Sequence, residues 1–236
     1  MNKFIFVFIF LSTCYTQAQV NYAAILGSDY TWAEKFCRSN YLTFHKCSNL
    51  FHNEIDMTMS MVFPELVRYS SVKDLLETSV LDAFYVQKGS IFVDFSIGPL
   101  QMKTSFAEVV ENYIHNRQAL AYLDPYFAYS EGDEFKIRRA RLNRLKNIKW
   151  QIAYASAFFC CVKDYWGESI PENKEERLRF FASAYNHKFL CEFAEIIAFQ
   201  SLKIYPDGFA GGKNQYAYSD VAFSFFLNSL PSIREH

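Results

Sequence analysis

The apolar stretch from Ile152 to Val162 constrains the fold of this chain more than any other feature. It follows a basic segment that begins near Lys136, and neither Gly nor Pro interrupts the pattern before Gly167. A long segment without helix breakers, closed by a glycine, is typical of an α-helix. The sequence therefore predicts one long helix over residues 134–166, with its second half buried inside the protein.

Most of the remaining chain also predicts helices. Apolar residues make up 51% of the 236 positions, while only 8 Gly and 6 Pro occur, which argues against a loop-rich protein. Periodicity predicts helices over 56–69, from Ser71 to about Leu81, and over 104–117 (capped by Thr104), 172–186, 191–202 and 218–230. The alternation over 84–97, with Gly89-Ser90 at its centre, predicts a short β-hairpin. We expect a single, mainly α domain over 19–236, with an N-terminal helical extension (19–55) and a core (56–230).

The amino terminus has the pattern of a secretory signal peptide. Lys3 precedes an apolar run from Phe4 to Leu11, and small and polar residues follow as far as Ala18. This pattern predicts a signal peptide over 1–18 and an exported protein, periplasmic or extracellular. A buried strand is one alternative for the run. A lipobox-like segment ending at Cys14, with a lipid anchor there, is another. No other apolar run approaches the ~20 residues of a membrane span.

The cysteines do not form a disulfide framework. Removal of residues 1–18 leaves an odd number of them, at Cys37, Cys47, Cys160, Cys161 and Cys191. At least one thiol is therefore free in an oxidising compartment. Their proximity in sequence favours a bridge between Cys37 and Cys47. We expect Cys160 and Cys161, in the apolar helix, to be buried free thiols.

Metal, cofactor and nucleic-acid binding are not predicted. Cys37, His45, Cys47 and His52 lie close in sequence, but their spacing does not match the paired ligands of zinc sites. The formal net charge is −1, which gives no electrostatic reason to expect a nucleic-acid partner. We therefore expect a protein without metal or cofactor.

Three short segments carry the candidate chemistry. They are FPEL at 63–66, SIGPLQM at 96–102 and ASAYN at 182–186. Their order and residue types resemble the lysozyme-like superfamily, in particular the soluble lytic transglycosylases and goose-type lysozymes. The resemblance implies a lysozyme-like α+β fold, in which one small β-hairpin region lines the active-site cleft. It also implies binding of peptidoglycan glycan strands and cleavage of the β-1,4 bond between N-acetylmuramic acid and N-acetylglucosamine.

Glu65 is the candidate acid. Its neighbours in sequence are apolar, and burial of a carboxyl group raises its pKa, so that it stays protonated and can act as a general acid. A surface glutamate with an ordinary pKa is the alternative. The resemblance implies that Glu65 is the catalytic acid and base and that Gln101, Met102, Tyr185 and Asn186 bind the substrate. By the same resemblance, the Tyr185 hydroxyl would bond to Glu65 and orient it.

Other residues leave alternatives open. Asp94 is a possible second carboxylate, or a turn or capping residue. The basic segment 136–149 is either a site for acidic stem peptides or a solvated helix face, and repulsion among its like charges favours some acidic neighbour. The aromatic residues of the loop over 120–134 either wall the cleft or pack in the core or at its rim; they are Tyr122, Tyr126, Phe127 and Tyr129. Leu66 stands where the family usually has Ser, which leaves three functions: a lytic transglycosylase, a hydrolytic muramidase, and an inactive module that binds glycan or protein.

Overall fold

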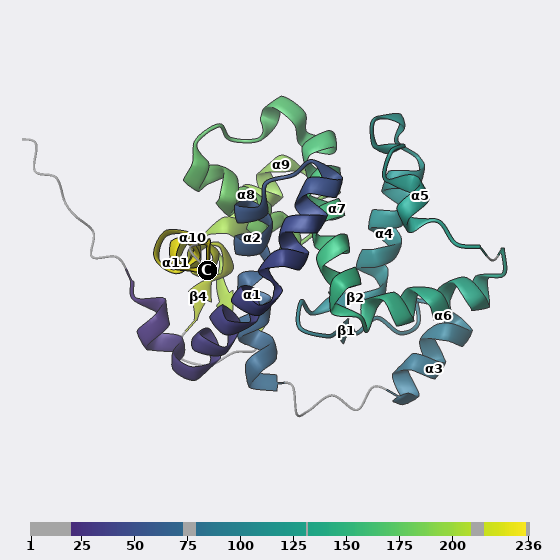
Figure 1. The fold of residues 1–236 in the computed structure, drawn as a ribbon, viewed down its shortest axis with the longest axis horizontal. Coiled ribbons are helices and arrows are strands. Elements are labelled where there is room, and N and C mark those ends of the chain that lie inside the picture. Colours follow the sequence, from purple (N-terminus) through teal and green to yellow (C-terminus); the bar gives the residue numbers. More distant parts are fainter. Residues whose placement is uncertain (1–19, 73–78, 131, 209–214, 235–236) are drawn as a thin grey trace, which may run out of the picture.

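The computed structural model describes residues 20–72, 79–130, 132–208 and 215–234, and these form a mainly helical protein (Figure 1). The predicted signal peptide, with Cys14, lies outside the described residues. Within them, no helix has the length and hydropathy of a membrane span. The helices are α1 (Tyr22–Phe51), α2 (Ile55–Val72), α3 (Ser79–Lys88), α4 (Thr104–His115), α5 (Asp124–Phe127), α6 (Glu134–Leu145), α7 (Ile148–Trp166), α8 (Lys174–Asn186), α9 (Phe193–Gln200), α10 (Tyr218–Asn228) and α11 (Leu230–Arg234).

Helix α7 is the central element of the core. Every residue from Gln151 to Val162 is buried, and α1, α2, α4, α6 and α8 all pack against this helix (Figure 1). The prediction that 152–162 lies inside the protein is therefore confirmed. The predicted single helix over 134–166 is wrong, because α6 ends at Leu145 and Asn147 caps a new helix. The Asn147 side chain accepts a hydrogen bond of 2.9 Å from the Lys149 N–H, which is the usual action of an N-cap asparagine.

The predicted hairpin over 84–97 is also wrong. The first part of that segment belongs to α3, with Tyr85 and Val86 buried, and Gly89 ends the helix with a positive φ of 84°. A glycine in this conformation commonly ends a helix, so Gly89-Ser90 marks a helix end and not a hairpin turn. The hairpin lies further along, where β1 (Ser96–Ile97) pairs antiparallel with β2 (Met102–Lys103). A second small sheet pairs β3 (Lys203–Tyr205) with β4 (Tyr216–Ala217).

Helix α2 extends beyond its predicted end. It runs through Pro64 and Ser71 as far as Val72, so Ser71 lies inside this helix and does not cap the next one. Residues 73–78, on which part of the predicted second helix falls, lie outside the described residues. Most side chains of α2 between Met57 and Val67 are fully buried, because α1, α8 and α10 cover it.

Helix α1 carries buried aromatic side chains into the same core. Tyr30, Phe44 and Phe51 are at most 1% exposed, and the helix packs against α2, α7 and α11. The predicted bridge between Cys37 and Cys47 is wrong, since both thiols are free and buried on α1. Ten residues of helix rise about 15 Å at 1.5 Å per residue, whereas the Cα atoms of a disulfide lie about 4.4–6.8 Å apart.

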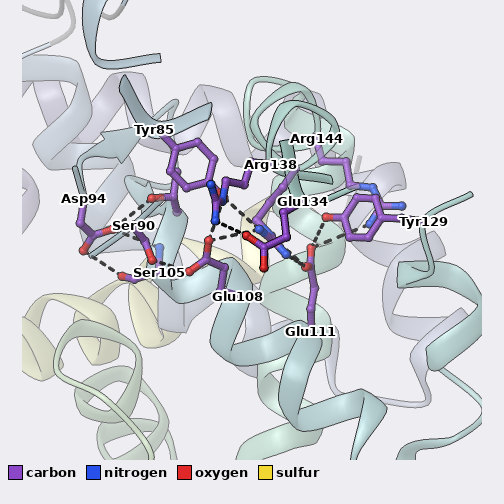
Figure 2. A network of polar contacts seen from close by, with 12 residues as sticks. Tyr85, Ser90, Asp94, Ser105, Glu108, Glu111, Tyr129, Glu134, Arg138 and Arg144 are labelled. Carbon is purple, nitrogen blue, oxygen red and sulfur yellow. Dashed lines mark hydrogen bonds and ion pairs between the residues drawn. The ribbon is translucent and has the colours of Figure 1, made fainter. Parts of the chain in front are cut away.

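The basic segment 136–149 meets acidic neighbours from other helices (Figure 2). Arg141 is buried and donates to Glu111 from Nε (2.8 Å) and to Glu108 from a guanidinium nitrogen (3.1 Å), both on α4. Glu111 also accepts from the hydroxyl groups of Tyr129 (2.6 Å) and Tyr154. This network ties α4, α6 and α7 together. The segment is therefore not solvated throughout, because Arg141 is buried, while the acidic neighbours expected from the repulsion of its like charges are present.

Candidate functional site

One pocket brings all the predicted site residues together. It has a volume of about 430 Å³, and its lining includes Glu65, Asp94, Gln101, Met102, Tyr185 and Asn186. These residues come from segments that are far apart in the sequence: α2, the β1–β2 hairpin with the loop before it, and the end of α8. Helix α7 contributes Phe158 to the lining of the pocket, and α4 contributes Ser105, Phe106 and Val109.

Glu65 is a buried carboxyl group on the last turns of α2. It is 4% exposed, and its neighbours Phe63 and Leu66 are fully buried. Burial raises the pKa of Glu65 above its ordinary value, and this effect is larger than the opposing effects of the Arg68 charge and of the hydrogen bonds that Arg68 donates. The pocket therefore holds a carboxyl group that keeps its proton to a higher pH than a surface glutamate does.

Arg68 is the direct partner of Glu65. One of its guanidinium nitrogens donates to both carboxylate oxygens, at 3.0 and 3.2 Å, and its Nε donates to the Pro206 carbonyl at 3.0 Å. The guanidinium group also lies over the ring of Tyr205, 5.3 Å from its centre. Arg68 was not among the predicted site residues. The spacing of three residues from Glu65 on one helix was the available signal, because such side chains are neighbours on a helix surface.

The turn of the β1–β2 hairpin is held by a buried amide of α7. Gln151 accepts from the Leu100 N–H (2.9 Å) through Oε1 and donates to the Ile97 carbonyl (3.0 Å) through Nε2. Gly98 has a φ of 63°, and a Cβ there would lie 1.9 Å from the Gln151 amide nitrogen. The turn can approach α7 this closely only because residue 98 has no side chain.

Gln101 is part of the same turn. It has a positive φ of 49°, and its side-chain amide donates to the Gly98 carbonyl at 3.0 Å. The side-chain amide group of Gln101 carries two hydrogens, and one of them makes this bond within the turn. The following residue, Met102, is 2% exposed and belongs to β2.

The predicted hydrogen bond between Tyr185 and Glu65 is wrong. The Tyr185 hydroxyl donates instead to the Leu100 carbonyl at 3.0 Å, so it fastens the hairpin turn to the end of α8. Its ring packs edge-on against Phe106 and Phe158, at centroid distances of 5.4 Å in both pairs. Tyr185 thus shapes the pocket wall and does not orient the carboxyl group.

Asp94 caps helix α4. Its carboxylate accepts from the Ser105 N–H (3.0 Å) and the Ser105 hydroxyl (2.8 Å), and from Thr104 at 3.3 Å. The predicted cap by Thr104 is wrong, since this residue already belongs to the helix and Asp94 accepts the amide group of Ser105 in its first turn. The alternative of a capping residue therefore describes Asp94, although its side chain also borders the pocket.

The aromatic residues of the loop over 120–134 do not line this pocket. Tyr126 and Phe127 pack against Phe51 and Trp150, and Tyr129 lies under the guanidinium groups of Arg141 and Arg144. A flanking wall built from them is therefore wrong for this pocket. Phe127 is buried in the core, whereas Tyr122 and Tyr126 pack at its rim and remain 51% and 38% exposed.

Comparison with known proteins gave no relative: no family model, curated protein or solved structure matched the chain. The candidate site is therefore interpreted from its own geometry.

Proposed function

We propose that this protein cleaves peptidoglycan glycan strands as a lytic transglycosylase, with Glu65 as the general acid and base. One observation carries the proposal. A buried carboxyl group with a raised pKa lines the same pocket as Gln101, Met102, Tyr185 and Asn186. A pocket that combines apolar walls with a few converging polar groups and a perturbed acid is a reasonable candidate active site.

The chemistry needs only one carboxyl group. Protonated Glu65 donates its proton to the glycosidic oxygen, and the bond from that oxygen to C1 of N-acetylmuramic acid breaks with assistance from the N-acetyl group. The Glu65 carboxylate then takes a proton from the 6-hydroxyl of the same sugar, which bonds to C1 and closes an anhydro ring. This route suits a site in which Asp94 is engaged as a helix cap.

Export agrees with this substrate. Residues 1–18 predict a signal peptide, and peptidoglycan lies outside the cytoplasmic membrane. The working form in this proposal is a periplasmic or extracellular protein, either released after cleavage or anchored through a lipid at Cys14.

A second candidate function is an inactive module that binds glycan or a protein. Two observations favour it: Arg68 donates to both oxygens of Glu65, and Leu66 stands where the resembled family usually has Ser. An ion pair of this kind favours the charged form of the carboxyl group, which cannot donate a proton. We favour catalysis because burial has the larger effect on the pKa of Glu65.

Digestion of purified sacculi by the mature protein tests the proposal. We expect soluble muropeptides that end in anhydro-N-acetylmuramic acid, which mass spectrometry identifies as lighter by one water than hydrolysis products. Reducing ends would instead assign the protein as a hydrolytic muramidase. Sedimentation with sacculi but no soluble product would support the binding module and overturn the enzymatic proposal.

A further inference from the structure

A cluster of three metal-ligating side chains lies at the end of α8, beside the pocket. It consists of His187, Cys191 and Glu195, whose ligand atoms all lie within 4.8 Å of one another. We propose that this cluster, the 187–191–195 triad, binds a zinc ion or a similar divalent transition metal. The inference is independent of the proposed glycosidase activity, because it rests on side chains other than Glu65 and its partners.

The distances within the triad suit a metal ion. Nε2 of His187 lies 3.5 Å from Oε2 of Glu195. A tetrahedral zinc ion, with bonds of about 2.0–2.3 Å, holds its ligand atoms roughly 3.3–3.8 Å apart. The two atoms are already at this separation. The Cys191 sulfur lies within 4.8 Å of both and donates to the Lys188 carbonyl at 3.4 Å, a bond that its thiolate gives up when it binds a metal.

The local structure positions His187 and Glu195. Oε1 of Glu195 accepts the Glu192 N–H at 3.3 Å in a capping box at the start of α9, which leaves Oε2 facing the histidine. The imidazole of His187 stacks on Phe199 at a centroid distance of 4.7 Å. The loop between them is anchored by buried Phe189, whose carbonyl accepts from the Trp166 indole at 3.2 Å.

The ligand types select the metal class. One imidazole, one thiol and one carboxylate form the mixed set that zinc accepts, and three protein ligands leave its fourth position to water. Calcium and magnesium prefer oxygen ligands alone, so this set argues against them. His187 and Glu195 are exposed, which gives an ion access from solvent.

Lys188 is the competitor for this site. Its Nζ lies 3.5 Å from Oε2 of Glu195, the same oxygen that would bind the metal. Binding of a cation therefore displaces the ammonium group. This contact predicts that Lys188→Ala tightens metal binding, because the change removes both the competing ammonium group and a positive charge beside the site.

Titration of the untagged, reduced mature protein with Co²⁺ and then Zn²⁺ tests the proposal. We expect one equivalent of Co²⁺ to bind with a thiolate-to-cobalt charge-transfer band, which Zn²⁺ abolishes. Cys191→Ser should lose the band, His187→Ala and Glu195→Gln should weaken binding at least tenfold, and Lys188→Ala should strengthen it. Gln at 195 keeps the capping box, so the fold is retained.

The matched control is His115→Ala, because His115 is an exposed histidine outside the triad. It should leave both the band and the affinity unchanged. No stoichiometric binding, a band that persists in Cys191→Ser, or equal weakening by His115→Ala and His187→Ala would overturn the proposal.

Discussion

At the scale of single residues, Arg68 controls the protonation of Glu65. Burial raises the pKa of this carboxyl group, and the charge of Arg68 lowers it. Without the positive charge of Arg68, little opposes the effect of burial, so the pKa of Glu65 rises further. Since the proposed catalysis needs protonated Glu65, the proposal predicts that activity is lost as the pH rises through that pKa.

We therefore expect Arg68→Met to move the alkaline limb of the pH–activity profile to higher pH. The folded pKa of Glu65 is already above its ordinary value and rises further in the variant, so the contribution of this group to stability is present at low pH and is lost as the pH rises through the folded pKa. Activity profiles and urea unfolding at several pH values measure both effects. Arg68→Lys keeps the charge and is the control, and an unmoved limb in Arg68→Met would contradict this role.

Gly98 determines whether the hairpin turn can reach α7. An added Cβ would meet the Gln151 amide nitrogen at 1.9 Å, on a backbone with a φ of 63°. We expect Gly98→Ala to lower the free energy of unfolding by about 2–4 kcal/mol, from steric overlap and backbone strain together.

Chemical denaturation measures this loss for Gly98→Ala. Gly132→Ala is the matched control, because a Cβ at position 132 has no atom within 4 Å and its φ is not positive. Equal stability of the two variants would show that the turn does not depend on the close approach.

At the scale of elements, the Arg141 network joins α6 to α4. Arg141 and Glu111 are both 8% exposed, and removal of the Arg141 guanidinium group takes the nearest charge partner (2.7 Å) from the buried carboxylate and leaves it Arg144 at 3.8 Å. We expect Arg141→Met to cost stability, up to the roughly 3–5 kcal/mol of a broken buried ion pair. Arg139→Met changes an exposed arginine of the same helix and should cost less than about 0.5 kcal/mol. Thermal unfolding compares them, and similar losses would argue against a structural role for the network.

The elements also show what the sequence could predict. The apolar pattern of 152–162 identified a buried helix, because burial on all sides needs apolar residues on all sides. The same pattern could not show the break at Asn147, which depends on one side-chain cap. Gly89 was misread for a related reason: a glycine with positive φ suits both a hairpin turn and a helix end, and only the buried face of α3 distinguishes them.

The sequence predicts which residues line the candidate site, but not which hydrogen bonds they form. Glu65, Gln101 and Tyr185 were selected from short segments, and they do line one pocket. The partner of Tyr185 is the Leu100 carbonyl, whose position depends on how the hairpin packs on α7. Such contacts between distant segments are set by tertiary packing, which periodicity and residue type do not encode.

At the scale of the whole molecule, α1 belongs to the core. Its buried side chains include Tyr30, Phe44 and Phe51, and each large apolar side chain contributes about 1.5–3 kcal/mol when buried. The sum over the buried face of α1 is comparable to the net stability of a typical protein, about 5–15 kcal/mol. We expect a fragment that starts at residue 54 to lack cooperative thermal unfolding. Circular dichroism measures this. A fragment that unfolds cooperatively near the temperature of the full mature chain would instead identify 19–55 as a dispensable extension.

The rate at which Glu65→Gln releases muropeptides from sacculi tests the central claim most directly. Gln preserves the shape of the side chain but has no acidic proton to donate, so we expect a loss of about 10²–10⁴-fold, with cooperative thermal unfolding retained. Glu168→Gln, which alters an exposed carboxylate outside the Glu65 pocket, should keep the full rate. A Glu65→Gln variant that releases muropeptides as fast as the unmodified protein would contradict the assignment of Glu65 as the acid.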